Sequence, residues 1–332
     1  MLISDGGRVM RSKTVIKNAG ATVAFIAGLL ALLLLASLVF QPKNNEKAAG
    51  IRDVAANGIL SEPENTIDVV VIGDSETYSS IIPLQIWEQH GITLYNCGTS
   101  GQMLCYSEEF LEKTFKTQSP KVVIFETSAI FRKFAYSKNF LHTVEGYLPV
   151  FRYHDRWKTL KKSDFSFEVE YTYIDPDKNY VYSDAVKPAN AADYMKVTDA
   201  REPIPSKNCG YIKAIKKMCD DNGAKFVFLS TPSTKNWGYS RHNSMLDIAE
   251  KLGVEYIDMN LMQTEVPINW ETDTRDSGDH LNHCGAVKVT DYLGGYLEGL
   301  GLFTDKRDDA DYSEWNVLLE KYKAKLCELS SK

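Results

Sequence analysis

Residues 67–75 read IDVVVIGDS, an apolar run that ends abruptly in the turn-forming sequence Gly73-Asp74-Ser75. The run is rich in β-branched residues and does not alternate with polar ones. It therefore predicts a strand that is buried on both faces, as in a parallel sheet. In open α/β sheets, ligands bind just outside the carboxyl ends of such strands. Ser75 is therefore expected at an edge of the sheet where chemistry can take place.

A short apolar strand followed by a helix recurs along the chain. Strands are predicted at 67–72, 93–97, 121–126, 225–230 and 254–259. Helices are predicted at 83–90, from 98–102 up to about 116, and at 210–222, 240–252, 285–300 and 312–329. Strands that alternate with helices of this length predict βαβ units. The fold class is therefore α/β, with a mostly parallel sheet between two helical layers.

The composition is that of an ordinary folded protein, with 44% hydrophobic and 25% charged residues. The net charge of -6 leaves no basic footprint, so nucleic acid is not expected as a partner. No pair of cysteines has the C-x-x-C spacing of a zinc site, and neither a metal nor a cofactor is predicted. The cysteines are expected to be scattered thiols, although an even count also permits disulfides. They are Cys97, Cys105, Cys209, Cys219, Cys284 and Cys327.

Residues 21–40 read ATVAFIAGLLALLLLASLVF, within an uncharged stretch from 18 to 42. This length crosses a bilayer as a helix, whereas a core helix is rarely apolar on all faces for so long. Before the run, Arg8, Arg11, Lys13 and Lys17 face one acid, Asp5, which predicts a cytoplasmic N-terminus and an extracellular remainder. A cleaved signal peptide is the alternative. The apolar core is long for one, however, and no clear Ala-x-Ala site follows it.

The predicted organisation has four parts. They are a cytoplasmic tail at 1–18, a transmembrane helix at 19–41, a polar linker at 42–66 and the α/β domain at 67–332. Residues 130–207 interrupt the alternation of strands and helices, and 169–182 have a hairpin-like pattern within this insertion. Long insertions in compact domains are usually lids or binding surfaces. A packed decoration without a role in substrate binding is the alternative.

Polar residues follow several of the predicted strands, at 73–75 (GDS), 96–102 (NCGTSGQ), 231–233 (TPS) and 276–283 (DSGDHLNH). A serine hydroxyl becomes a good nucleophile when a neighbouring base takes its proton and a third group orients that base. Ser75, His280 and a nearby acid satisfy this requirement. Gly98 and Gly101 would let backbone N–H groups approach a developing oxyanion.

On these motifs, residues 67–300 resemble the SGNH/GDSL hydrolase superfamily. The matching residues are Gly73-Asp74-Ser75, then Asn96, Gly98, Ser100 and Gly101, and finally His280 followed by Gly285. The resemblance implies a three-layer α/β/α fold, with Ser75 as nucleophile and His280 as base. It also implies an oxyanion hole made by the amide of Ser75 and by Gly101. The chain is most similar in type to membrane-anchored, extracytoplasmic proteins of Gram-positive bacteria that add or remove acyl groups on cell-surface polymers.

Two positions depart from the family pattern. The third block usually supplies an oxyanion-binding Asn, but residues 126–130 read ETSAI, where Thr127 or Ser128 would have to replace it. Losing one such donor typically lowers the rate ~100 to 1,000-fold. The acid usually precedes the histidine by three residues, and that position is Ser277. Asp276 is the preferred acid, because a short loop can fold its carboxylate back onto the imidazole, and Asp279 is the alternative.

Asn236, Trp237 and His242 are candidate substrate-binding residues, since they follow the strand at 225–230. A helix cap with surface polar residues explains them equally well. The predicted function is a serine-dependent acyl esterase or O-acyltransferase that acts on an extracellular glycan or cell-wall polymer through an acyl-enzyme.

A transferase needs an acyl donor delivered by a separate membrane protein, because acyl-CoA is not available outside the cell. The alternative function is a non-catalytic scaffold or binding subunit in surface-polysaccharide assembly. The missing Asn favours this alternative, and the presence of Ser75, His280 and two nearby acids opposes it.

Overall fold

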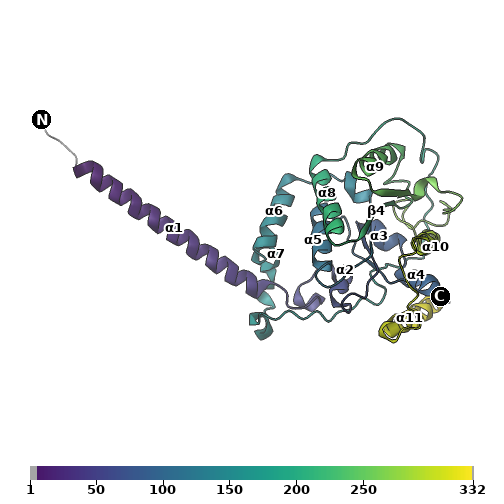
Figure 1. Cartoon of the computed structure of the whole chain (residues 1–332), viewed down its shortest axis with the longest axis horizontal. Coiled ribbons are helices and arrows are strands. Elements are labelled where there is room, and N and C mark those ends of the chain that lie inside the picture. Colours follow the sequence, from purple (N-terminus) through teal and green to yellow (C-terminus); the bar gives the residue numbers. More distant parts are fainter. Residues whose placement is uncertain (1–5, 331–332) are drawn as a thin grey trace. The chain divides into compact units, whose positions relative to one another are not determined.

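The computed structural model of the chain describes residues 6–330, which form two compact units (Figure 1). The α1 unit contains the residues up to Ile51 together with Ala135–Tyr171. The sheet unit contains Arg52–Phe134 and the residues from Thr172 onwards. The predicted cytoplasmic tail lies partly outside the described residues, which begin at residue 6.

The sheet unit is built on five parallel strands in the order β2-β1-β3-β4-β5. The strands are β1 (Val69–Ile72), β2 (Leu94–Asn96), β3 (Val122–Glu126), β4 (Lys225–Ser230) and β5 (Glu255–Asp258). Every residue of β1 is fully buried, which confirms the predicted buried parallel strand. Because all the pairs are parallel, the carboxyl ends of the strands meet at one edge of the sheet.

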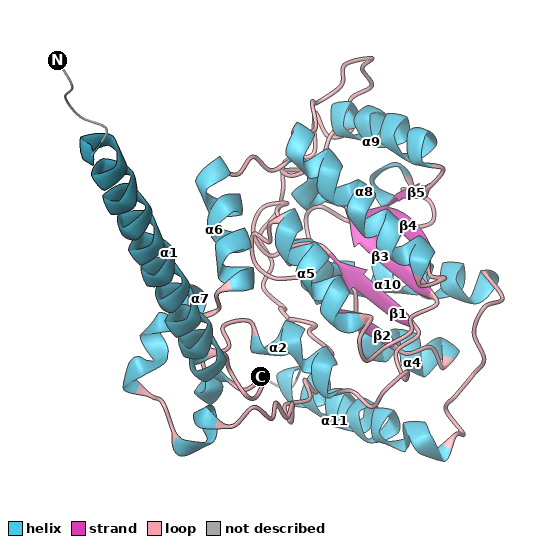
Figure 2. Cartoon of the chain, turned by 60° about the vertical axis from the view of Figure 1, so that its left-hand side comes forward, coloured by secondary structure: helices cyan, strands magenta, loops and turns pink. Residues whose placement is uncertain are grey.

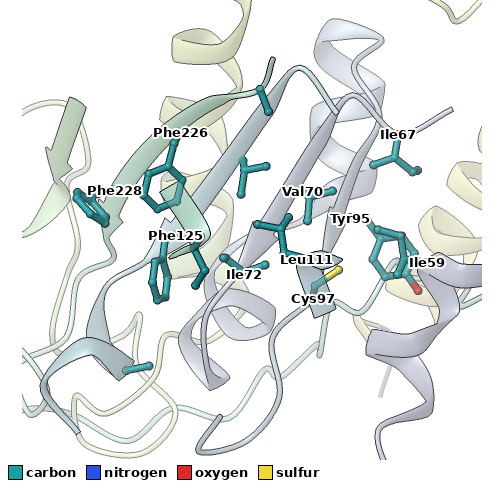
Figure 3. Close-up of a cluster of buried hydrophobic side chains, with 14 of the residues drawn as sticks. Ile59, Ile67, Val70, Ile72, Tyr95, Cys97, Leu111, Phe125, Phe226 and Phe228 are labelled. Carbon is teal, nitrogen blue, oxygen red and sulfur yellow. The ribbon is translucent and has the colours of Figure 1, made fainter. Parts of the chain in front are cut away.

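Helices cover both faces of the sheet, which confirms the predicted three-layer α/β/α arrangement (Figure 2). Val70, Ile72 and Phe125 point into a cluster on one face, together with residues of α5 and α8 (Figure 3). Val71 and Ile124 point into the opposite cluster with residues of α4 and α10. The helices of this unit include α3 (Ser75–Ser80), α4 (Pro83–His90), α5 (Leu104–Thr114), α8 (Ser206–Asp221), α9 (Tyr239–Leu252), α10 (His283–Gly299) and α11 (Ser313–Ser330).

Part of the predicted linker is folded into the sheet unit. Residues 54–61 form α2 (Val54–Asn57) and a 3-10 turn, η2 (Gly58–Ser61). Ile59 is fully buried in the core, and a Cβ at Gly58 would lie 2.3 Å from the Tyr95 hydroxyl oxygen. The polar composition of this stretch predicted a linker, but Ile59 and Gly58 pack against the core of the sheet unit.

The hairpin expected at 169–182 was wrong, since the described structure has no strand there. The residues that flank the turn do not pair with each other: the N–H of Glu170 donates to the Lys43 carbonyl, and the N–H of Val181 donates to the Tyr78 carbonyl. The Asp175 carboxylate accepts hydrogen bonds from the backbone N–H of Asp177 and Asn179 and so closes a turn. The tyrosines that suggested β structure flank this turn instead.

The α1 unit contains one long helix, α1 (Gly6–Phe40), in which Val15–Phe40 is long and apolar enough to cross a membrane. Only 6% of its most apolar 18 residues are buried, unlike the residues of a core helix. Its carboxyl end packs against α7 (Val150–Tyr153) and the 3-10 turns η4 (His154–Lys158) and η5 (Lys162–Phe165) (Figures 1 and 2). The unit also contains α6 (Tyr136–Tyr147) and η1 (Lys47–Ala49).

Candidate active site

Ser75 stands at the carboxyl end of β1, where it is the first residue of α3. The turn before it requires glycine, because Gly73 has a φ of 155° and its Cβ would lie 2.7 Å from Thr77 and 2.8 Å from Glu126. The Asp74 side chain caps α3 by accepting a hydrogen bond from the N–H of Glu76. The N–H of Ser75 belongs to the first turn, for which a helix supplies no acceptor of its own.

Ser75, His280 and Asp276 form a continuous hydrogen-bonded series. The Ser75 Oγ lies 2.8 Å from Nε2 of His280, although the two residues are 205 positions apart. The other ring nitrogen, Nδ1, lies 2.6 Å from Oδ2 of Asp276. Asp279 is less well placed, with a carboxylate oxygen 3.9 Å from the same nitrogen. Of the two candidate acids, Asp276 is the one in hydrogen-bonding contact with the histidine.

A tight loop folds Asp276 back onto His280. Ser277 and Gly278 both have positive φ values, 65° and 88°, which reverse the chain between the acid and the base. The Thr274 hydroxyl accepts a hydrogen bond from the N–H of Gly278 and donates one to the carbonyl of His280. Asp276 also accepts a hydrogen bond of 2.6 Å from the backbone N–H of His280 through its Oδ1. Both carboxylate oxygens therefore fix the position of the histidine.

The environment keeps Asp276 ionised. Burial alone would raise the pKa of this carboxyl, but hydrogen bonds from the backbone and ring of His280 outweigh it, and the charges of His280 and Arg275 add to them. The pKa of Asp276 therefore lies below its ordinary value. An ionised carboxylate can accept the Nδ1–H of the imidazole, which leaves Nε2 free to act as a base toward Ser75.

The loop after β2 lies directly against the start of α3. A Cβ at Gly98 would lie 1.9 Å from the Thr77 hydroxyl oxygen and 2.5 Å from the Asp74 carbonyl oxygen, so no side chain fits there. Gly101 follows in the same loop with a φ of 61°. The structure thus brings the two loops that carry the predicted oxyanion-hole residues, Ser75 and Gly101, next to each other.

Three residues at this edge were not identified from the sequence. Burial raises the pKa of Tyr78, and the nearby side chains of Ser100 and Ser75 partly offset that rise. The Arg132 guanidinium donates to Asp74 at 2.6 Å, and its Nη1 would lie 3.1 Å from a Cβ added at Gly101. Arg275 donates to the hydroxyl of Ser79 at 2.8 Å. Tyr78 alone had a local signal, because it is three residues after Ser75 and shares its helical face.

Thr127, the candidate replacement for the missing Asn, follows the third strand and lies in the interior. Its side chain is fully buried, and its hydroxyl lies 2.5 Å from that of Ser230. The backbone N–H of Ser128 donates to the Glu126 carboxylate at 3.0 Å. This burial argues against the oxyanion-hole role that the sequence suggested for Thr127.

Two acids are buried behind the nucleophile. Burial raises the pKa of Glu76 well above its ordinary value, and the neighbouring charges of Glu126 and Asp74 raise it further. Burial likewise raises the pKa of Glu126, with Asp74 adding to the effect. Both glutamates therefore hold a proton more strongly in the folded protein than an exposed glutamate would.

Asn236 joins Glu76 to Asp279. Its amide nitrogen donates to Oε1 of Glu76 at 2.9 Å and to Oδ1 of Asp279 at 2.5 Å. Ligand atoms of Glu76, Asp279 and His280 lie within 4.8 Å of one another, a spacing that could hold a metal ion. Here an amide donor occupies the position between the two carboxylates, and both ring nitrogens of His280 have protein partners. This donor set does not fit a metal.

Trp237 and His242, two of the predicted substrate-binding residues, are buried around one carboxylate. Trp237 is 6% exposed, and its indole N–H donates to Oδ2 of Asp258. His242 is 9% exposed, and its Nδ1 lies 2.8 Å from the same oxygen. Their burial around Asp258 argues against the predicted contact with substrate. The sequence could not reveal this, because Asp258 belongs to a different strand.

No protein-family model matches the sequence, and no curated protein matches it significantly. The solved structures that resemble it include a GDSL-like lipase from Bacteroides thetaiotaomicron, with a TM-score of 0.34 and 11% identity over 70% of this chain and 86% of that one. The psychrotrophic esterase EstA from Pseudoalteromonas sp. has a TM-score of 0.39 and 12% sequence identity, over 70% of this chain and 98% of that one. An acetyl xylan esterase has a TM-score of 0.38 and 14% sequence identity, over 69% of this chain and 99% of that one. All of these likenesses are distant.

Proposed function

We propose that the chain is a serine-dependent acyl esterase or O-acyltransferase of the SGNH/GDSL type. The hydrogen-bonded series from Ser75 through His280 to Asp276, with distances of 2.8 Å and 2.6 Å, carries this proposal. Such a series supplies a nucleophile, its base and the group that orients the base. Its three members come from two loops at the carboxyl edge of the sheet, where α/β proteins bind their ligands.

The proposed reaction has two halves. His280 takes the Ser75 proton at Nε2 while Oγ attacks the acyl carbonyl carbon, and the oxyanion is held by the N–H groups of Ser75 and Gly101. The ester bond breaks, and the leaving alcohol receives the proton from His280. Water or an acceptor hydroxyl then attacks the acyl-enzyme and gives its proton to His280. Oγ leaves and regains that proton, so Ser75 is restored.

We further propose that the substrate is an ester on an extracellular glycan or cell-wall polymer. Val15–Phe40 is long and apolar enough to hold the chain in a membrane, and the basic residues before it favour a cytoplasmic N-terminus. A transferase reaction would draw its acyl group from a separate membrane protein. Protease added to intact cells should then digest the sheet unit, and protection of that unit would contradict the orientation.

A fluorophosphonate probe tests the chemistry. The full-length chain in detergent should be labelled, with the mass increase on the peptide that contains Ser75, and should release acetate from p-nitrophenyl acetate. Ser75→Ala should abolish labelling and lower turnover roughly 10⁴ to 10⁶-fold, because the members of such a triad act as a unit. Absence of labelling in the wild type, together with equal turnover in the two proteins, would sink the proposal.

The burial of Thr127 favours a second candidate, an SGNH-fold binding subunit with impaired catalysis. One oxyanion donor is expected to contribute ~100 to 1,000-fold to the rate. A subunit that only binds should retain the polymer equally in wild type and Ser75→Ala, with no ester cleaved by either. If the wild type cleaves the ester and Ser75→Ala does not, the chain is an enzyme and not only a binding subunit.

A further inference from the structure

The segment Ala135–Tyr171 exposes an unusual number of large apolar side chains. Six aromatic residues are between 64% and 79% exposed: Tyr136, Phe140, Tyr147, Trp157, Phe165 and Phe167. They are spread over α6, η4, η5 and the chain that follows η5. Removing these side chains from water is favourable, and it lowers the free energy by about 25 cal/mol per Å² of apolar surface. Large exposed apolar surface usually marks a protein or membrane contact.

The segment is attached to the carboxyl end of the apolar helix α1. The N–H of Val150 donates to the Ser37 hydroxyl at 3.2 Å. The N–H of Glu170 donates to the Lys43 carbonyl at 2.9 Å. These contacts join both ends of the region 150–170 to the residues at and just after the end of α1. Trp157, Phe165 and Phe167 therefore belong to the level at which the proposed membrane span ends, and α6 leads directly into this region.

A buried arginine makes this attachment specific. Arg156 is 7% exposed, and its guanidinium donates to the Phe40 carbonyl and to the Asp164 carboxylate. The chain after α1 is shaped to receive it, since Gly50 has a φ of 92° and its Cβ would lie 2.7 Å from Cδ of Arg156. A buried charge pair is costly to form unless it is fully hydrogen-bonded. Its presence indicates that the segment holds a defined position at the end of α1.

Lysines lie among the exposed aromatic residues. Lys158, Lys161 and Lys162 are exposed, and the ammonium of Lys158 lies 5.2 Å from the centre of the Trp157 ring. Trp and Tyr are enriched where a membrane meets water, and lysines there can reach the phosphate groups of lipids. The combination differs from an apolar groove for a peptide, because the aromatic residues occupy several elements and are interspersed with charge.

We propose that Ala135–Tyr171 lies in the headgroup layer of the leaflet that contains the carboxyl end of α1, with its exposed aromatic side chains inserted among the lipids. The partner is a phospholipid bilayer surface. This inference rests on the proposed membrane span and extends it from a single helix to a membrane-bound unit. It is independent of the proposed reaction at Ser75.

Tryptophan quenching by brominated lipids tests the proposal. The full-length chain is reconstituted in liposomes of phosphatidylcholine and phosphatidylglycerol, with bromine either near the acyl carbonyl or near the chain end. Trp157 should be quenched more by the shallow bromine, and Trp157→Phe should lose that component because the other four tryptophans belong to the sheet unit. Trp87, Trp237 and Trp315 are buried there, and Trp270 is partly buried. In the Trp157→Phe background, Phe140→Trp and Phe167→Trp should restore shallow quenching.

Two matched variants in the same background separate the possible failures. Leu246→Trp reports an exposed position in the sheet unit and should stay unquenched, whereas Leu30→Trp reports α1 and should be quenched by the deep bromine. Quenching at Leu30→Trp without quenching at positions 140, 157 and 167 would overturn the interfacial role and leave the span intact. Such a result would point to a protein partner for this surface. Absence of quenching at Leu30→Trp as well would overturn both the span and this inference.

Discussion

The two units of this chain distribute polar and apolar residues in opposite ways. The sheet unit buries its apolar side chains on both faces of the sheet and gathers polar ones, including Ser75 and His280, at one edge. The α1 unit buries a charge pair, Arg156 with Asp164, and exposes aromatic residues such as Phe167. The first pattern is that of a fold in water. The second is the pattern expected where lipid is part of the solvent.

After Ser75→Ala, the largest effect in the sheet unit is expected to separate the two acids beside His280. Asp276→Asn should lower turnover of p-nitrophenyl acetate about 10³ to 10⁴-fold, because an amide cannot hold the required tautomer of the histidine. Asp279→Asn should cost less than about tenfold, since its carboxylate lies 3.9 Å from the ring and is held by Asn236. Steady-state kinetics of the two variants measure this difference. A larger loss in Asp279→Asn would show that the acid is wrongly assigned.

The close contact between the first two loops should be sensitive to a single methyl group. Gly98→Ala places a Cβ 1.9 Å from the Thr77 hydroxyl oxygen, so we expect a loss of stability of about 1 to 3 kcal/mol and a lower turnover. Gly210→Ala in α8 is the matched control, because no atom lies within 4 Å of its added Cβ. Thermal unfolding compares the two. Equal stability of both variants would mean that the loops are farther apart than described.

The buried glutamates should make stability fall as the pH rises. Burial and the Asp74 charge raise the pKa of Glu126 in the folded state well above 4.5, so the folded protein keeps a proton that the unfolded chain releases. Stability is lost with rising pH between those two pKa values. Glu126→Gln cannot titrate and should show a smaller decline, measured as the unfolding midpoint from below pH 4.5 to neutral pH. An unchanged slope would show that Glu126 is ionised in the fold.

The smallest effect is expected in the α1 unit. Phe140→Ser and Phe167→Ser should change turnover of the soluble ester by less than about twofold, because exposed substitutions usually shift stability by no more than ~0.5 kcal/mol. Both side chains are more than two-thirds exposed. A loss of turnover in either variant close to that expected for Asp276→Asn would contradict the proposed difference between the two units.

The sheet, and the grouping of Ser75 and His280 at one edge of it, could be predicted from the sequence because both have strong local signals. Uninterrupted β-branched runs identified the buried strands, and polar turns after them identified Ser75 and His280. The parallel arrangement then placed those turns at one edge. The choice between Asp276 and Asp279 depended on two residues, Ser277 and Gly278, whose positive φ values reverse the chain. A serine at positive φ gives no sequence signal.

The remaining parts depended on contacts between distant residues. Trp237 and His242 were predicted to bind substrate from their position after a strand. The structure shows that both side chains hydrogen-bond to Asp258, which lies on another strand. Ile59 and Gly58 belong to a polar stretch, and only Tyr95 explains why that stretch is folded. The insertion at 130–207 predicted a lid or binding surface, and that interpretation stays a prediction beside the proposed lipid contact of 135–171. Composition does not distinguish a surface that meets substrate from one that meets lipid.

The acid and the base of the proposed triad are only four residues apart, and they are joined through both oxygens of Asp276. Closing so short a loop costs little chain entropy, whereas the contact between His280 and Ser75 spans 205 positions. Partial unfolding should therefore separate the nucleophile from its base while the Asp276–His280 pair persists. Loss of activity would then precede loss of the loop, so turnover can serve as an early indicator of damage to the whole sheet.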